Sequence, residues 1–168
     1  VSVEQWGEIQ WSTMKSAFSY CGDIKFNATD TPDLSNVTDM SLMFESSRNF
    51  NQSLNDWDVS NVTDMSGMFN EASAFNGDIS SWDVSNVITM SKMFKGASVF
   101  NGDVSKWDTS NVTSMEGMFN RASVFNGEVS DWDVSNVKSM NAMFIRAKAF
   151  NGNVSNWDVS SVTDMTYM

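Results

Sequence analysis

The chain has 168 residues, of which 41% are hydrophobic and 18% are charged, and its formal net charge is −11. This charge repels nucleic acids and attracts cations or basic partner surfaces. Histidine is absent and cysteine occurs once, which removes the usual general base, the usual metal ligand and any internal disulfide. No apolar run approaches the roughly 20 residues of a membrane helix. We therefore expect one ordered body that is not an enzyme, binds no nucleic acid and inserts no segment into a membrane.

Residues 1–31 differ from the rest of the chain. Trp11 to Met14 aligns with Val37 to Met40, but the spacing between the two segments is one residue longer than the 25-residue spacing of the later copies. In addition, a segment that contains Pro32 replaces the Trp-Asp pair found in the later copies. An atypical first repeat is expected of a cap, which must close the exposed end of a stack. We interpret residues 1–31 as an N-terminal cap whose Trp6, Ile9 and Trp11 cover the end of the core.

Residues 32–168 form tandem 25-residue repeats, truncated in the last copy, that continue from the cap as one domain. Aromatic and methionine residues recur in register without an insertion: Trp57, Trp82, Trp107, Trp132 and Trp157; Met65, Met90, Met115 and Met140; Phe69, Phe94, Phe119 and Phe144; Phe75, Phe100, Phe125 and Phe150. A single copy cannot bury these side chains, whereas stacked copies can. The columns are therefore predicted to form the core.

Two periodicities share each repeat. Met65, Met68, Phe69 and Ala72 have the spacing of one helix face, with Asn61 as a candidate N-cap. Residues 78–87 alternate apolar and polar side chains and predict a short parallel strand, and the glycine at position 77 is expected to adopt a positive φ at the corner between the two. The predicted fold is an α/β solenoid with short parallel strands on one face and short helices on the other.

The repeat unit WDVSNVTDMSGMFNEASAF, residues 57–75, resembles the bacterial surface leucine-rich-repeat proteins of the BspA-like type. The resemblance covers nearly the whole chain. It implies a right-handed leucine-rich-repeat-like stack, an extracellular or cell-surface location, and a role in adhesion or in binding a protein or another cell-surface ligand. It carries no catalytic motif.

The strand face is the predicted contact surface. One outward column is always aspartate, and a neighbouring column varies; together they supply the candidate binding residues Asp33, Asp58, Asp83, Asp108, Asp133 and Asp158, with Asp56, Lys106 and Asp131. Stacked carboxylates repel one another by about 0.9 kcal/mol per neighbouring pair in bulk water. Either hydrogen bonds within each Asp-x-Ser-Asn turn or bound cations such as Ca²⁺ must offset this repulsion.

Other interpretations of the repeat are weighed against adhesion. Asn51, Asn76, Asn101, Asn126 and Asn151 are expected to form an internal ladder that satisfies buried backbone groups. A uniform carboxylate column singles out no pair with divergent environments, which argues against a glycosidase, and aspartate in place of threonine argues against ice binding. A structural spacer and a calcium-binding solenoid remain as alternatives. The last copy, which stops at Met168, leaves an open apolar end and raises the possibility of end-to-end self-association.

Overall fold

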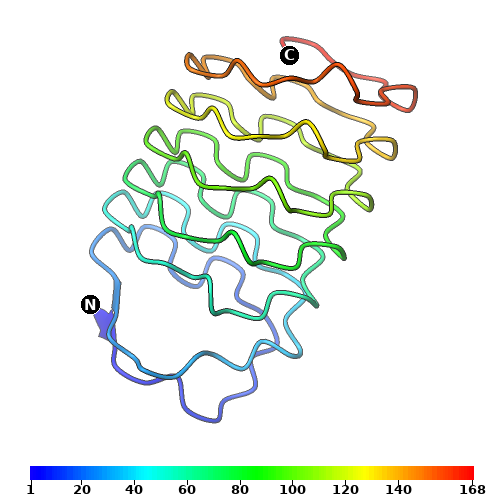
Figure 1. Cartoon of the computed structure of the whole chain (residues 1–168). Helices are drawn as coiled ribbons and strands as arrows, with labels where there is room; N and C mark the ends of the chain where they lie inside the picture. Colours follow the sequence, from blue (N-terminus) through cyan, green and yellow to red (C-terminus); the bar gives the residue numbers. More distant parts are fainter.

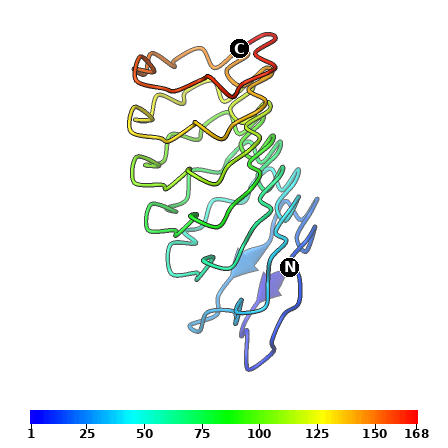
Figure 2. The same cartoon turned by 90° about the vertical axis from the view of Figure 1, so that its right-hand side faces the viewer.

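The computed structural model describes residues 1–168 as a stack of coils, with the N-terminus at one end and the C-terminus at the other (Figure 1). The regular elements are β1 (Ser2–Val3) and β2 (Lys25–Phe26), which pair in parallel near the N-terminus (Figure 2). Beyond them, isolated parallel bridges join successive coils. One joins Gln10 to Asp33, and a series joins residues at the same place in each repeat: Asp39, Asp64, Thr89, Ser114, Ser139 and Asp164. The repeat of the sequence is thus one coil of the stack.

The prediction of short helices on one face is wrong, because no helix is present. The segment that begins at Met65 is a series of β-turns, in which Met68 N–H donates to Met65 O and Ala72 N–H donates to Phe69 O. Gly67 and Glu71 have φ angles of 61° and 57°. A positive φ at the third position is what a type II turn requires, and it ends any helical path.

The hydrogen bonds of this turn ribbon alternate between local and inter-coil partners. Met65, Gly67 and Phe69 each donate a backbone N–H to the next coil, at Thr89 O, Ser91 O and Met93 O, over 2.8–3.1 Å. Of 74 backbone hydrogen bonds, only one joins β1 to β2 within their bounds, so turns and inter-coil bonds satisfy the backbone in place of helices and sheets. The backbone N–H groups that would form hydrogen bonds within a helix here donate to carbonyl groups of the neighbouring coil.

The predicted parallel strands of each repeat are also absent. Residues 78–87 contain two turns, closed by Trp82 N–H to Ile79 O and by Val87 N–H to Val84 O. The alternation itself holds, since Trp82 and Val84 are buried while Asp83 is exposed. The expected α/β architecture is therefore replaced by turns, with the inter-coil bridges at residues such as Asp64, outside the predicted strands.

Gly77 does not adopt the positive φ predicted for the corner. Its role is to allow a close approach of the chain, because a Cβ at this position would lie 2.1 Å from the carbonyl oxygen of Gln52 in the preceding coil. A backbone atom cannot give way as the end of a side chain can. Glycine is therefore required here by the contact between coils.

The predicted core columns are confirmed. Phe69 and Phe75 stack within one coil at a centroid separation of 3.8 Å, and Phe69 stacks on Phe94 of the next coil at 5.6 Å. Trp82, Trp107 and Trp132 form a stacked series with centroids 6.4 and 6.5 Å apart. Each aromatic ring thus packs both within its coil and against the neighbouring coils, and this makes the core continuous along the stack.

Residues 1–31 close the N-terminal end of the core. Trp6 is buried and packs edge-to-face on Trp57 at 5.4 Å, and Trp11 packs against Trp6 at 6.5 Å. Ile9, in contrast, is 54% exposed and does not cover the core as expected. The Gln52 side chain takes the place of a strand here, because its amide accepts from Phe26 N–H and donates to Phe26 O.

Candidate binding surfaces

The aspartate column lies at the surface, in the same turn of each coil. Asp58, Asp83, Asp108, Asp133 and Asp158 are exposed and Asp33 is half-buried. Each of these carboxylates accepts a hydrogen bond from the backbone N–H of the serine two residues later, over 2.9–3.1 Å. The local hydrogen bonding considered for this column is therefore present, and it holds the carboxylates in a fixed row.

Hydrogen bonds outweigh repulsion along the row. Hydrogen bonding to Ser110 holds the pKa of Asp108 below its usual value, while the neighbouring Asp133 carboxylate raises that pKa by a smaller amount. Asp133 follows the same pattern, with Ser135 lowering its pKa and Asp158 raising it. Both carboxylates therefore stay ionised at neutral pH, despite the like charges beside them in the row.

The variable column beside the row is exposed at Asp56, Lys106 and Asp131. Lys106 lowers the pKa of Asp103, a carboxylate outside the row, by a smaller amount than the hydrogen bonds from Ser105 do. Nowhere in the structure do three or more acidic, histidine or cysteine side chains gather as a metal-ligand group. The aspartates thus form a one-dimensional charged row and do not converge on a point.

Two asparagine columns join the coils from outside. Asn76 N–H donates to Asn51 Oδ1 at 2.7 Å, and the bond repeats along Asn101, Asn126 and Asn151. This ladder was predicted, but it is exposed and not internal. Asn61, expected to cap a helix, instead donates its side-chain amide to Ser35 O of the preceding coil. Both columns therefore have structural partners.

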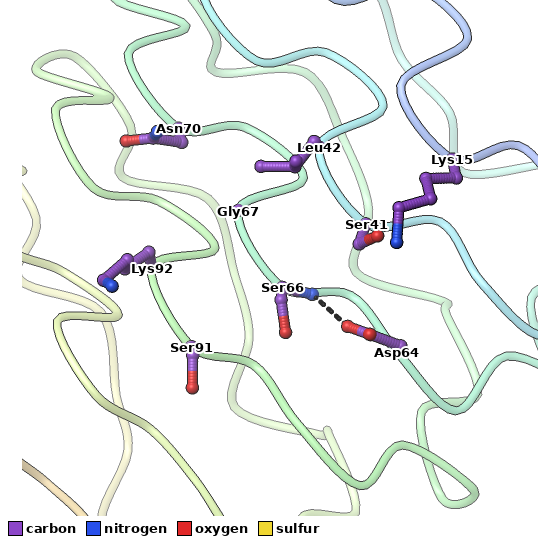
Figure 3. Close-up of a pocket in the computed structure, with 9 residues that line it drawn as sticks. All are labelled: Lys15, Ser41, Leu42, Asp64, Ser66, Gly67, Asn70, Ser91 and Lys92. Carbon is purple, nitrogen blue, oxygen red and sulfur yellow. Dashed lines mark hydrogen bonds between the residues drawn. The ribbon is translucent and has the colours of Figure 1, made fainter.

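A groove on the turn ribbon was not anticipated from the sequence. It has a volume of about 290 Å³ and nine lining residues, of which only Leu42 is apolar (Figure 3). None of the predicted binding residues lines it. The sequence signal is a column of small polar residues, Ser41, Ser66 and Ser91, that changes to Glu116 and Asn141 in the later coils. This change was overlooked because the segment was interpreted as a helix.

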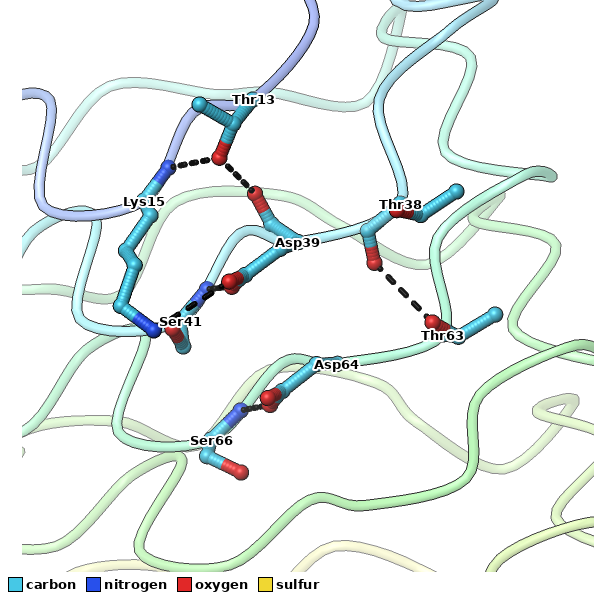
Figure 4. Close-up of polar contacts among 8 residues, drawn as sticks. All are labelled: Thr13, Lys15, Thr38, Asp39, Ser41, Thr63, Asp64 and Ser66. Atoms are coloured by element: carbon cyan, nitrogen blue, oxygen red, sulfur yellow. Dashed lines mark hydrogen bonds and ion pairs between the residues drawn. The ribbon is translucent and has the colours of Figure 1, made fainter.

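The polar contacts at the N-terminal side of this groove repeat from coil to coil (Figure 4). Asp39 and Asp64 each accept a hydrogen bond from a backbone N–H two residues on, at Ser41 and Ser66, over 2.8 Å. Lys15 Nζ lies 3.3 Å from Asp39 Oδ2. The groove is thus bordered by one carboxylate that pairs with a lysine and by Asp64, which has no such pair.

The fold and its surfaces define a repeat protein whose equivalent residues are separated by one 25-residue coil. Residues 12–122 and 81–168 match the family described as "Mycoplasma protein of unknown function, DUF285". The two matches together cover most of the chain, which therefore belongs to this family. No curated protein and no solved structure matches the chain.

The structure also bears on membrane insertion. It contains no helix of the length and apolar character needed to cross a bilayer.

Proposed function

We propose that this chain is a non-enzymatic repeat module of a cell-surface or secreted protein, and that it supports adhesion or protein binding through its aspartate row. The observation that carries the proposal is the row itself: exposed carboxylates, each held by its own serine, repeat at the same place in successive coils. A rigid row loses little conformational entropy when a partner binds. The resemblance to BspA-like surface proteins supports the same role and location.

Charge complementarity indicates the kind of partner. The net charge of −11 and the ionised row favour a basic protein surface. The variable column, with Lys106 between Asp56 and Asp131, changes the local charge from coil to coil and would set the register of such a partner. Association through this surface should weaken with rising ionic strength, because salt screens exposed charges.

The test compares two double variants that remove the same charge. Asp83→Asn with Asp108→Asn neutralises the row, whereas Asp78→Asn with Asp103→Asn neutralises two carboxylates outside it that make the same hydrogen bond to a serine. Asparagine keeps an acceptor oxygen, so both variants should fold. Binding to a panel of immobilised extracellular-matrix proteins and to cultured cells would be measured at low and at physiological salt.

We expect the row variant to lose binding that the control variant keeps. Equal binding by both variants would reject the row as the contact surface. It would favour the spacer alternative, in which the aspartates only stabilise their own turn of the coil by accepting the hydrogen bond from the serine. Calorimetry with Ca²⁺ tests the remaining alternative, since a cation-binding row would give heat of binding and a higher melting temperature.

A further inference from the structure

The groove on the turn ribbon has the features of a small-ligand site, and it is separate from the aspartate row. It crosses successive coils and is lined by residues whose side chains the core does not use (Figure 3). Its volume of about 290 Å³ lies at the lower end of the range for ligand pockets. One monosaccharide-sized molecule would fill such a space.

Small side chains create the groove. Gly67, with a φ of 61°, occupies the position that holds Leu42 in the coil before and Lys92 in the coil after. A Cβ at Gly67 would lie 2.7 Å from Leu42 Cδ2, so a side chain there would crowd Leu42, which also lines the groove. In the later coils, Glu116 and Asn141 replace the serines, and no such groove forms there.

Two buried polar atoms at the groove have no hydrogen-bond partner. Ser41 is 4% exposed and its hydroxyl is unpaired. Asn70 donates its amide to Glu45 at 3.1 Å, which identifies the remaining amide atom as oxygen, and that Oδ1 is buried and unpaired. Unpaired buried polar atoms are rare and costly in native proteins. The Lys15 ammonium lies beside the Ser41 hydroxyl in both close views, so movement of this half-exposed side chain would open the hydroxyl to a ligand (Figures 3 and 4).

The charges of the groove select the class of ligand. Lys15 and Lys92 are each paired with a carboxylate, at 3.3 Å to Asp39 and 3.1 Å to Glu116, so they present little free positive charge to an anion. A metal ion is disfavoured because no group of three or more acidic, histidine or cysteine side chains gathers in the groove to hold one. The single apolar residue disfavours an apolar ligand. What remains is a neutral molecule with several hydrogen-bond donors and acceptors.

We propose that the groove binds a neutral sugar residue. Sugar hydroxyls both donate and accept: Asp64 can accept from them, and the Lys15 and Lys92 ammonium groups can donate to them. The Ser66 and Ser91 hydroxyls already bond to Thr89 and Ser114, and each oxygen can accept a further hydrogen bond from the sugar. An open groove with few apolar contacts gives weak binding, and we expect a dissociation constant of about 1 mM for a single sugar. This inference does not depend on the aspartate row and can hold if the adhesion proposal fails.

The experiment titrates the labelled protein with D-glucose, D-galactose, D-mannose and N-acetyl-D-glucosamine, and with inorganic phosphate as an anionic probe, and follows the backbone amides by NMR. At least one sugar should shift the amides of Ser66, Gly67 and Asn70, and phosphate should not. Gly67→Lys, which copies the residue of the next coil, should weaken binding at least about tenfold by filling the groove. Gly96→Lys is the matched control, because Gly96 also has a positive φ, of 72°, and a Cβ there would meet the end of the Glu71 side chain at 2.7 Å, while neither residue lines the groove.

Three results would overturn the proposal. The first is that no sugar shifts the groove amides. The second is that phosphate shifts them at lower concentration than every sugar. The third is that Gly67→Lys binds as tightly as Gly96→Lys. The amide spectra of both variants report whether each is folded, so loss of binding through unfolding would be recognised.

Discussion

A single tryptophan of the repeat has two roles, packing and hydrogen bonding between coils. The indole N–H of Trp132 donates to Val104 O at 3.0 Å, and Trp82, Trp107 and Trp157 make equivalent bonds to carbonyls of the preceding coil. Trp11 lies outside this pattern, and its buried indole N–H has no partner. The same residue type therefore occurs with and without its hydrogen bond in one molecule.

This contrast gives a matched pair of variants. Trp132→Phe should lower the free energy of unfolding by about 2 kcal/mol, because it removes both a buried hydrogen bond and part of a packed ring. Trp11→Phe should lower the free energy of unfolding by less than about 1 kcal/mol, because the packing it loses is partly offset by the removal of a buried donor that has no partner. Urea unfolding of both variants measures the difference. Equal losses would mean that the indole bonds contribute nothing beyond packing.

The serine-capped aspartates predict the acid sensitivity of the fold. Hydrogen bonding in the folded chain lowers the pKa of Asp33, Asp58, Asp108, Asp133 and Asp158 below the usual value of an aspartate. A carboxyl whose pKa is depressed by folding stabilises the protein above its unfolded pKa, and this stabilisation is lost as the pH falls through the folded pKa.

The melting temperature should therefore be constant from pH 7 to about 5 and should decrease below about pH 4. Thermal unfolding followed by circular dichroism across this range tests the prediction. The melting temperature of Asp108→Asn should decrease less steeply with falling pH than that of the parent protein, since the asparagine side chain accepts a hydrogen bond from the Ser110 N–H at every pH. A variant with an unchanged acid profile would show that this capped carboxylate does not contribute to the dependence.

At the scale of the element, the turn ribbon and a helix make opposite predictions for glycine. Ala142 has a φ of 58°, so Ala142→Gly should raise the free energy of unfolding by about 1 kcal/mol by relieving the left-handed conformation. In a helix the same change would lower it by about 1 kcal/mol. Gly117→Ala should lower the free energy of unfolding, because alanine at a φ of 59° is unfavourable. The added Cβ itself would not clash, since it would lie 3.4 Å from Lys92 Cγ, an ordinary contact distance.

Chemical denaturation measures the change in the free energy of unfolding of each variant, and the sign of that change distinguishes a ribbon of turns from a helix. A ribbon of turns requires Ala142→Gly to stabilise and Gly117→Ala to destabilise. The opposite pair of signs would contradict the turns described here and restore the helix.

The mistaken helix has a physical explanation. Met65, Met68, Phe69 and Ala72 are all fully buried, as a helix face would be, because two successive turns return the chain to the core at the same intervals. Side-chain periodicity therefore could not separate the two structures. The backbone signal was present, since Gly67, Gly96 and Gly117 lie at the third position of their turns, but Leu42, Lys92 and Ala142 occupy equivalent places and obscure it.

At the scale of the whole molecule, the register of the repeat predicted which side chains are buried and that the copies stack. It also predicted an exposed aspartate row, for which hydrogen bonds within each turn were one of two explanations. It could not predict the groove, because the hollow depends on small residues that coincide in neighbouring coils, at Ser41, Ser66 and Gly67. Such a coincidence has meaning only when the inter-coil offset of the turn ribbon is known.

The stack as a whole should tolerate the removal of one complete coil. Deleting residues 82–106 joins Ser81 to Trp107, which recreates the natural junction of Ser81 with Trp82 and keeps every column in register. Because each coil contacts mainly its neighbours, we expect a folded, shorter stack whose denaturant m-value decreases by about 15%, in proportion to the surface removed. The control deletes only residues 82–94, which places polar residues in the core columns and should prevent cooperative unfolding. If the complete-coil deletion also failed to unfold cooperatively, contacts beyond neighbouring coils would have to hold the stack together.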